Sequence, residues 1–260
     1  MQLAGANHGI RPAEQSLLAR FREMAGQAAN EYRPVLTAFL NPRQRVLAEV
    51  AATAAGVAIF GQGGFTQAEM QRVIFAPEYF TPEPDDFDIT ILACDYAEKF
   101  TRLHHSTILG TLVHQGIDRS VFGDIITRDP AWQIAVSTAM VPFVVGNVTQ
   151  IGKTKVQWHP VTGRDVLSIS VPWHDHTTVV SALRVDAIVA GAFNLSRTQV
   201  KDLIASGHIQ VNWLAEGRAD AQLVPGDMVS VRCYGRVQLQ DVLGMTEKNR
   251  WRVALRVLVK

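Results

Sequence analysis

The chain has 260 residues, of which 47% are hydrophobic and 19% are charged, and its formal net charge is +1. This composition predicts packed domains rather than disorder, and the length suits two or three of them. We expect neither membrane insertion nor secretion, since no apolar run reaches roughly 18–20 residues and the N-terminus does not resemble a signal sequence. The two cysteines lie far apart, which is typical of a reduced, cytoplasmic protein.

The first part of the chain is rich in helix-forming residues from position 11 to about position 55. Apolar residues recur at helical spacing over residues 17–28, which predicts a first helix. A second helix is predicted after Asn41 and Pro42, because asparagine can cap a helix and proline suits its first turn.

The pattern changes at residue 57. Residues 57–60 predict a short apolar strand, residues 61–64 a glycine-rich turn, residues 67–71 a helical stretch and residues 72–76 a second strand. We therefore expect residues 1–84 to form a helical N-terminal region with a small β-hairpin.

The next stretch predicts the order strand-helix-strand-strand-helix-strand. This order is typical of the ferredoxin-like (RRM-like) fold, on which many RNA-binding sheets are built, and we assign it to residues 85–170. The aromatic signature of RRM proteins is missing, so RNA binding here rests on analogy of fold. The expected strands are residues 89–92, 123–127, 132–137 and 153–158, and the expected helices are residues 106–115 and 139–147.

Residues 171–178, with their polar His174-Asp175-His176 run, are typical of an interdomain linker. The spacing of these histidines could hold a metal ion, and so could His104-His105. Neither pair has a third ligand in a defined element, so we expect no metal and no other cofactor.

The last eighty residues are the basic part of the chain. Residues 181–260 contain 11 lysines and arginines against 7 acidic residues, whereas residues 1–180 contain 14 against 17. This asymmetry indicates that the C-terminal part meets a polyanion. Residues 183–192 predict a helix, and Ser196 and Gln199 have the spacing of a capping box that starts another, which Gly207 ends. Strands are expected at residues 209–213, 228–232, 236–242 and 250–259.

Two short helices followed by a small curled sheet resemble the S4 (αL-type) RNA-binding domain, which we place at residues 181–260. The fold class expected for the whole chain is therefore α+β. The resemblance rests on Leu183-Arg184-Val185-Asp186, Leu195-Ser196-Arg197, Val200, Leu203-Ile204, Gly207, Val211-Asn212 and Pro225-Gly226-Asp227.

The start of the second C-terminal helix predicts a phosphate site, because free N–H groups and the positive end of the helix dipole meet there. Arg197 lies at that end, Lys201 follows one turn later, and Arg184 is expected on the same side. The alternative is that these charges belong to ordinary solvated helices. The residues expected to contact RNA are Arg184, Asp186, Ser196, Arg197, Thr198, Lys201, Asn212, Arg232 and Arg236.

Further motifs along the chain carry a second resemblance. They are Pro34-Val35-Leu36-Thr37, Phe39-Leu40-Asn41-Pro42-Arg43, Gly63-Gly64-Phe65, Pro77-Glu78-Tyr79-Phe80, His105 with Ile108-Leu109-Gly110, Phe122-Gly123-Asp124-Ile125 and Tyr234-Gly235-Arg236. These motifs are similar to those of the YlmH family of bacterial S4-domain proteins. The resemblance implies a ribosome-associated quality control factor that binds the large ribosomal subunit and peptidyl-tRNA in rescue of stalled ribosomes. Its implied partners are rRNA and tRNA, and we expect a monomer.

The main enzymatic alternative is an RNA methyltransferase. Residues 61–64 resemble a glycine-rich nucleotide loop, and Asp85 and Asp86 follow about twenty residues later. A tight turn between two strands explains the same residues, and no nucleophile or acid–base pair stands out. We therefore expect a binding protein and no enzyme.

Overall fold

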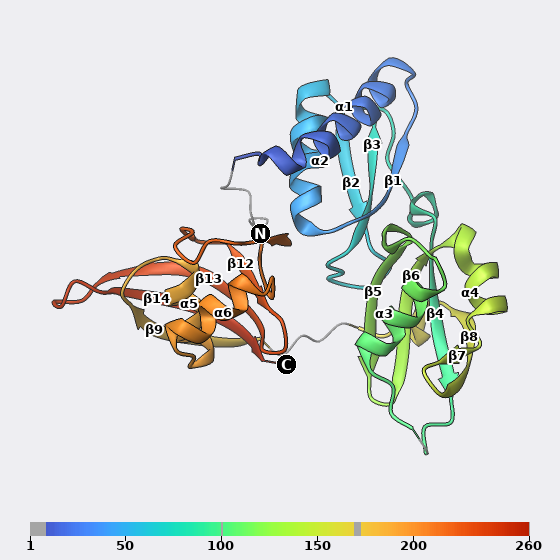
Figure 1. The fold of residues 1–260 in the computed structure, drawn as a ribbon. Coiled ribbons are helices and arrows are strands. Elements are labelled where there is room, and N and C mark those ends of the chain that lie inside the picture. The colour runs from blue at the N-terminus through green and yellow to red at the C-terminus, as the bar shows by residue number, and fades with distance from the viewer. Residues whose placement is uncertain (1–8, 100, 169–172, 260) are drawn as a thin grey trace. The chain divides into compact units, whose positions relative to one another are not determined.

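The computed structural model describes residues 9–99, 101–168 and 173–259 of the chain. The chain divides into two compact units, one of Pro12–Ser170 and one of Val171–Lys260 together with Met1–Arg11. Both units combine helices with antiparallel sheets (Figure 1), so the fold class is α+β, as predicted. None of the described helices combines the length and the hydropathy that crossing a bilayer requires.

The first part of Pro12–Ser170 is a three-stranded antiparallel sheet with two helices packed on it (Figure 1). Its elements in chain order are η1 (Pro12–Glu14), α1 (Gln15–Asn30), β1 (Val35–Leu40), α2 (Pro42–Ala55), β2 (Ala58–Gln62) and β3 (Gln71–Ala76). The strands lie in the order β1-β3-β2. Phe21 of α1, Leu47 of α2 and Phe75 of β3 are buried in the core between helices and sheet.

The predicted second helix is confirmed, whereas strand β1 was not predicted. Asn41 caps α2 through a capping box with Gln44, and both of its hydrogen bonds measure 2.9 Å. Strand β1 lies in the stretch that we expected to be rich in helix. It pairs with β3, and Thr37 Oγ1 accepts the Val73 N–H at 2.9 Å. A strand distant in sequence therefore decides the conformation of β1.

The helical stretch predicted at residues 67–71 is wrong. These residues form turns that lead into β3, to which Gln71 already belongs. The Asp124 carboxylate accepts the backbone N–H groups of Glu69 at 2.6 Å and Met70 at 3.2 Å. The Asp124 carboxylate on β5 thus accepts two backbone N–H groups that a helix would have paired with its own carbonyl groups.

The rest of Pro12–Ser170 forms a five-stranded antiparallel sheet. Its elements are η2 (Pro84–Phe87), β4 (Ile89–Tyr96), α3 (His105–His114), η3 (Arg119–Val121), β5 (Phe122–Arg128), β6 (Ala131–Ser137), η4 (Thr138–Met140), α4 (Val141–Asn147), β7 (Gln150–Ile151), β8 (Thr154–Val161) and η5 (Gly163–Asp165). The predicted succession of strands and helices is present, with the short β7 added. The strand order is β5-β6-β4-β8-β7, and α3 and α4 bury one face through residues such as Leu92, Ile108 and Val144.

The other face of the five-stranded sheet is partly covered by the N-terminal sheet of the same unit. Phe39 of β1 and Phe65, which follows β2, are 2% and 3% exposed and pack with Ile91 and Ala135. Gly123 of β5 permits this close approach, because a Cβ atom there would lie 2.7 Å from the Phe39 ring. The two sheets of Pro12–Ser170 therefore share a core.

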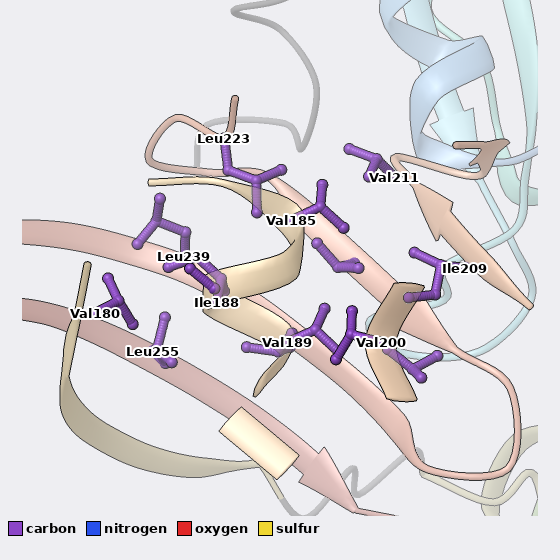
Figure 2. Close-up of a cluster of buried hydrophobic side chains, with 14 of the residues drawn as sticks. Val180, Val185, Ile188, Val189, Val200, Ile209, Val211, Leu223, Leu239 and Leu255 are labelled. Atoms are coloured by element: carbon purple, nitrogen blue, oxygen red, sulfur yellow. The ribbon is translucent and has the colours of Figure 1, made fainter. Parts of the chain in front are cut away.

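The C-terminal unit is a six-stranded antiparallel sheet with both helices on one face. Its elements are β9 (His174–Val180), α5 (Val185–Phe193), α6 (Arg197–Ala205), β10 (Ile209–Val211), β11 (Leu214–Ala215), β12 (Met228–Val231), β13 (Gly235–Met245) and β14 (Trp251–Val259). The strand order is β11-β10-β12-β13-β14-β9. Figure 2 shows how Ile188 and Val200 of the helices meet Leu239 and Leu255 of the sheet in one apolar core.

The linker predicted at residues 171–178 is wrong where the structure describes it. Residues 174–178 belong to β9, which pairs with β14 along its length, from Trp251 opposite Val180 to Val257 opposite His174. Residues 171 and 172 of the predicted linker lie outside the described residues, and residue 173 directly precedes β9. Because β9 is polar and at the sheet edge, only its pairing with a strand some seventy residues later identifies it.

Candidate nucleic-acid interface

The start of α5 is held by the segment that precedes β12. Val185 N–H donates to Ala221 O at 3.0 Å, and Asp186 N–H donates to Ala219 O at 3.1 Å. Leu223 N–H in turn donates to Leu183 O at 2.8 Å. Residues 219–223 therefore lie beside the first turn of α5 and satisfy donors that the helix leaves open.

The start of α6 is fixed by Ser196, as predicted. Gln199 N–H donates to Ser196 Oγ at 3.2 Å, and Ser196 N–H donates to Gln199 Oε1 at 2.9 Å. Val200 is buried in the core of the unit. Arg197 and Lys201, four residues apart on the helix, are both exposed on its outer side.

Three of the predicted cations come together at this place. Arg184, Arg197 and Lys201 line one open hollow of about 280 Å³, together with Asp186, Ala219 and Asp220. We call these three residues the helix-face cluster. They come from the residue that precedes α5 and from one side of α6, so packing between the two helices brings them together.

Asp186 positions Arg184 and is not itself exposed. The Arg184 guanidinium donates from Nε to Asp186 Oδ1 at 3.1 Å and from Nη2 to Oδ2 at 2.9 Å. This pairing raises the pKa of Arg184 above its ordinary value. Asp186 is only 2% exposed, so its predicted contact with RNA does not agree with its position, and its role is to orient the arginine.

Arg250 joins the margin of this region, although the sequence did not single it out as a site residue. A second hollow, of about 210 Å³, lies between β9 and α5 and is lined in part by Ser181, Arg197 and Arg250. Arg197 Nη2 donates to Ser181 Oγ, and Arg250 Nη2 donates to Val179 O at 3.2 Å. Arg250, which precedes β14, lines the same hollow as Arg197 because β14 pairs with β9, a pairing that no local pattern reveals.

Asn212 has a structural position instead of the predicted RNA contact. It is 2% exposed, and its Nδ2 donates to Asp227 Oδ1 at 3.0 Å while its Oδ1 accepts the Met228 N–H at 2.9 Å. Both ends of the amide are therefore engaged within the protein. The Asn212 and Asp227 motif residues hold the chain reversal before β12 in place.

The remaining predicted residues do not gather at one place. Thr198 is exposed in the first turn of α6, beside Arg197. Arg232 is exposed in the turn between β12 and β13. Arg236 lies on β13 next to Val237, whose side chain is buried under the helices. Because side chains alternate along a strand, Arg236 is on the sheet face away from α5 and α6.

In the five-stranded sheet, the face away from the helices has an exposed polar part. Lys155, Gln157 and His159 alternate along β8 with buried residues, and His159 Nδ1 lies 3.0 Å from Asp95 Oδ2 on β4. The part of the same face near β5 and β6 is filled by Phe39 and Phe65. The exposed part near β8 is therefore the portion that a ligand can reach.

The glycine-rich loop that suggested a methyltransferase is filled by protein atoms. A Cβ atom on Gly63 would lie 2.4 Å from Met70 O, and one on Gly64 would lie 2.6 Å from Ile91 Cδ1. Turns and then strand β3 follow the loop directly. Gly64 permits close packing against β4, and Gly63 permits the tight turn toward β3, which agrees with the turn interpretation.

Comparison with known proteins gives matches to two family models and to named relatives. Residues 82–164 match the family model described as "Putative RNA-binding domain in YlmH", and residues 13–80 match the model described as "YlmH, N-terminal". The chain is 34% identical over 244 residues to the ribosome-associated protein quality control protein P2 of Bacillus subtilis (strain 168), covering 94% of this chain and 95% of that protein.

A solved structure is also similar. The cell division protein ylmH from Streptococcus pneumoniae is 31% identical, with a TM-score of 0.53, and the match covers 60% of this chain and 94% of the other. The relative from Bacillus subtilis extends over almost the whole chain, and the two family models account for most of Pro12–Ser170. The chain therefore belongs to the YlmH family.

Proposed function

We propose that this protein is a ribosome-associated RNA-binding factor that recognises structured rRNA and tRNA through the helix-face cluster. The observation that supports this most directly is the shared hollow of Arg184, Arg197 and Lys201 at the start of α6. Cations that converge beside a helix N-terminus suit the phosphates of folded RNA, which is recognised by shape and backbone more than by sequence.

We also propose an S4 identity for the C-terminal unit and a ferredoxin-like identity for residues 85–170. The strand order β5-β6-β4-β8 with both helices on one face supports the second assignment. The capped α6, the preceding α5 and the sheet that follows support the first. The S4 unit would then begin with β9 and so include residues before position 181.

The relative named for ribosome-associated quality control supports a role on stalled ribosomes. We propose that the protein binds the large ribosomal subunit in the cytoplasm as a monomer and stabilises peptidyl-tRNA there. The matched RNA-binding family model suggests that residues 82–164 add a second contact. The Lys155 and His159 side of the five-stranded sheet is the accessible place for it.

The proposed action is binding without catalysis. The loop that suggested a methyltransferase has Met70 O and Ile91 Cδ1 where side chains at Gly63 and Gly64 would lie, and the Gly63 N–H donates to Gln62 Oε1 at 3.0 Å. Rescue by stabilising a bound tRNA needs affinity and geometry, which the helix-face cluster supplies, and no reacting group.

Reversal of two charges tests the proposal. Arg197→Glu with Lys201→Glu should weaken binding to an rRNA hairpin by at least about tenfold and lower the slope of log affinity against log salt by about two, because two phosphate contacts are lost. Filter binding at several salt concentrations measures both values, and cosedimentation with 50S subunits extends the test to the ribosome.

The matched control is Arg20→Glu with Arg22→Glu, two exposed arginines on α1. This variant has the same net charge but leaves the helix-face cluster intact. Equal affinity of the cluster variant and the control would contradict the proposal.

A further inference from the structure

The six-stranded sheet has a second face, which neither helix of the C-terminal unit covers. Val237 and Leu239 of β13 and Val253 and Leu255 of β14 are buried beneath α5 and α6; Leu239 and Leu255 can be followed in Figure 2. The residues between them point the opposite way. The side chains of this outer face include Arg236, Gln238, Arg252, Arg256, Thr177 and Val179.

Three arginines lie along this outer face. Arg236 is opposite Leu258, Arg256 is opposite Gln238, and Arg252 is opposite Gly244. Six residues of β14 separate positions 258 and 252, so the arginines extend over about 20 Å at about 3.3 Å per residue. Arg252 and Arg256 are exposed, and Arg236 is half-buried. We call Arg236, Arg252 and Arg256 the sheet-face cluster.

An aromatic side chain stands beside the central arginine. Arg256 Cζ lies 5.5 Å from the centre of the Trp173 ring, and Arg256 Nε lies 3.9 Å from Asp175 Oδ1. The Arg256 guanidinium therefore lies within cation–π range of the Trp173 ring. Trp173 is half-buried, so part of its ring remains accessible for stacking.

The chemistry of this face differs from that of the helix-face cluster. Here the cations form a row along the paired strands β13 and β14 instead of converging on a helix end. Asp175 and Asp241 lie on the same face, so attraction at long range is small and contacts must be local. A row of arginines with an aromatic ring is the arrangement that binds a nucleic acid strand whose bases are free to stack.

We propose that the outer face binds a single-stranded RNA segment, with phosphates on Arg252 and Arg256 and a base on Trp173. This goes beyond the proposed function, which places RNA on the helix-face cluster and on the five-stranded sheet but none on the outer face of the C-terminal sheet. The C-terminal unit then holds two RNA segments at once, a folded one against α6 and an unpaired one against β14.

The test uses the full chain, a fluorescein-labelled uridine 12-mer as the unpaired probe and the rRNA hairpin as the folded probe. Arg252→Glu with Arg256→Glu should weaken binding of the 12-mer by about tenfold or more and lower its salt slope by about 1.4, while hairpin affinity stays within about twofold. Trp173→Ala should weaken the 12-mer by about fivefold to a hundredfold, the cost of one lost stack.

Three further measurements keep the outcomes separate. Arg197→Glu with Lys201→Glu should spare the 12-mer, and Arg20→Glu with Arg22→Glu should spare both probes. Wild-type protein should retain the labelled 12-mer when captured on immobilised hairpin. If the Glu variant loses its circular dichroism spectrum, Arg252→Gln with Arg256→Gln replaces it.

Two results would overturn the proposal. One is equal 12-mer affinity of the sheet-face variant and the α1 control. If polyglutamate then binds wild type but not the sheet-face variant, the outer face binds an acidic protein instead of RNA. The other is competition between hairpin and 12-mer for one site. Either result leaves the helix-face assignment intact, because that assignment depends on the hairpin measurement alone.

Discussion

Several polar residues of this protein act by holding other residues in place. Asp186 is buried and orients Arg184 through two hydrogen bonds, and Asn212 uses its amide to fix the turn before β12. Both residues belong to the motifs on which the S4 resemblance rests. A motif residue can therefore matter for RNA binding without touching RNA, and the difference is measurable.

Replacement of Asn212 separates these two roles. Asn212→Ala should lower the free energy of unfolding by about 1–3 kcal/mol, because it leaves the buried Met228 N–H and Asp227 Oδ1 without this partner. RNA affinity of the folded fraction should not change. Chemical denaturation measures the free energy of unfolding, and filter binding measures the RNA affinity. A loss of RNA affinity with unchanged stability would instead indicate that Asn212 contacts RNA directly.

Asp124 makes the stability of the protein depend on pH. Burial raises the pKa of its carboxyl from 3.8 to about 6. The folded state therefore binds a proton more tightly than the unfolded state, so the stabilisation from protonation is complete below about pH 4 and is lost as pH rises through about 6. Denaturation of wild type should show this loss.

Asp124→Asn removes the titrating group and should reduce the change in unfolding free energy between pH 4 and pH 7. The NH2 group of the asparagine would face one of the backbone N–H donors of Glu69 and Met70, which then loses its acceptor. The variant should therefore be less stable at every pH. The readout is the difference in pH dependence, not absolute stability. Identical pH profiles of the variant and wild type would assign the dependence to other groups.

Among the elements, β9 is the one that the local sequence predicts least well. It consists largely of exposed polar residues, yet it forms the edge of the six-stranded sheet and brings Val180 into the core at 3% exposed. It also supplies Ser181 and Val179 O at its end as acceptors for Arg197 and Arg250. The edge strand thus contributes both to the core and to the margin of the helix-face cluster.

Two neighbouring valines test the docking of β9. Val180→Ala should lower the unfolding free energy by about 1–3 kcal/mol, because it leaves a gap in the core. Val179→Ala, at a position that is 37% exposed, should change it by less than about 0.5 kcal/mol. Denaturation followed by tryptophan fluorescence measures both, and equal effects would show that β9 does not pack as described.

On the scale of the whole molecule, the buried cores define the compact units, whereas the succession of strands and helices does not. We expected a boundary near residue 84, and the two matched family models also divide there. The structure nevertheless joins both parts in one compact unit, because Phe39 and Phe65 fill part of the second sheet. Phe39 and Phe65 thus occupy the part of this sheet face near β5 and β6.

In the C-terminal unit, too, tertiary packing decides which of the predicted contact residues lie together. The predicted contact residues do not form one surface, since Arg184, Arg197 and Lys201 line the hollow beside α6 whereas Arg236 lies on the outer face of the sheet. The packing of helices on one side only leaves two chemically different faces. This division is the basis for proposing two RNA segments instead of one.

Periodicity and capping residues were sufficient to locate most of the elements and the start of α6, because those features depend on neighbours within a few residues. The Ser196–Gln199 capping box and the order of the main strands and helices between residues 89 and 158 are examples. Strand pairing and side-chain hydrogen bonds between distant parts of the chain decided the rest. Strand β1, strand β9, the turn at residues 67–71 and the burial of Asn212 all depend on partners that lie fifteen to more than seventy residues away, and no local pattern specifies them.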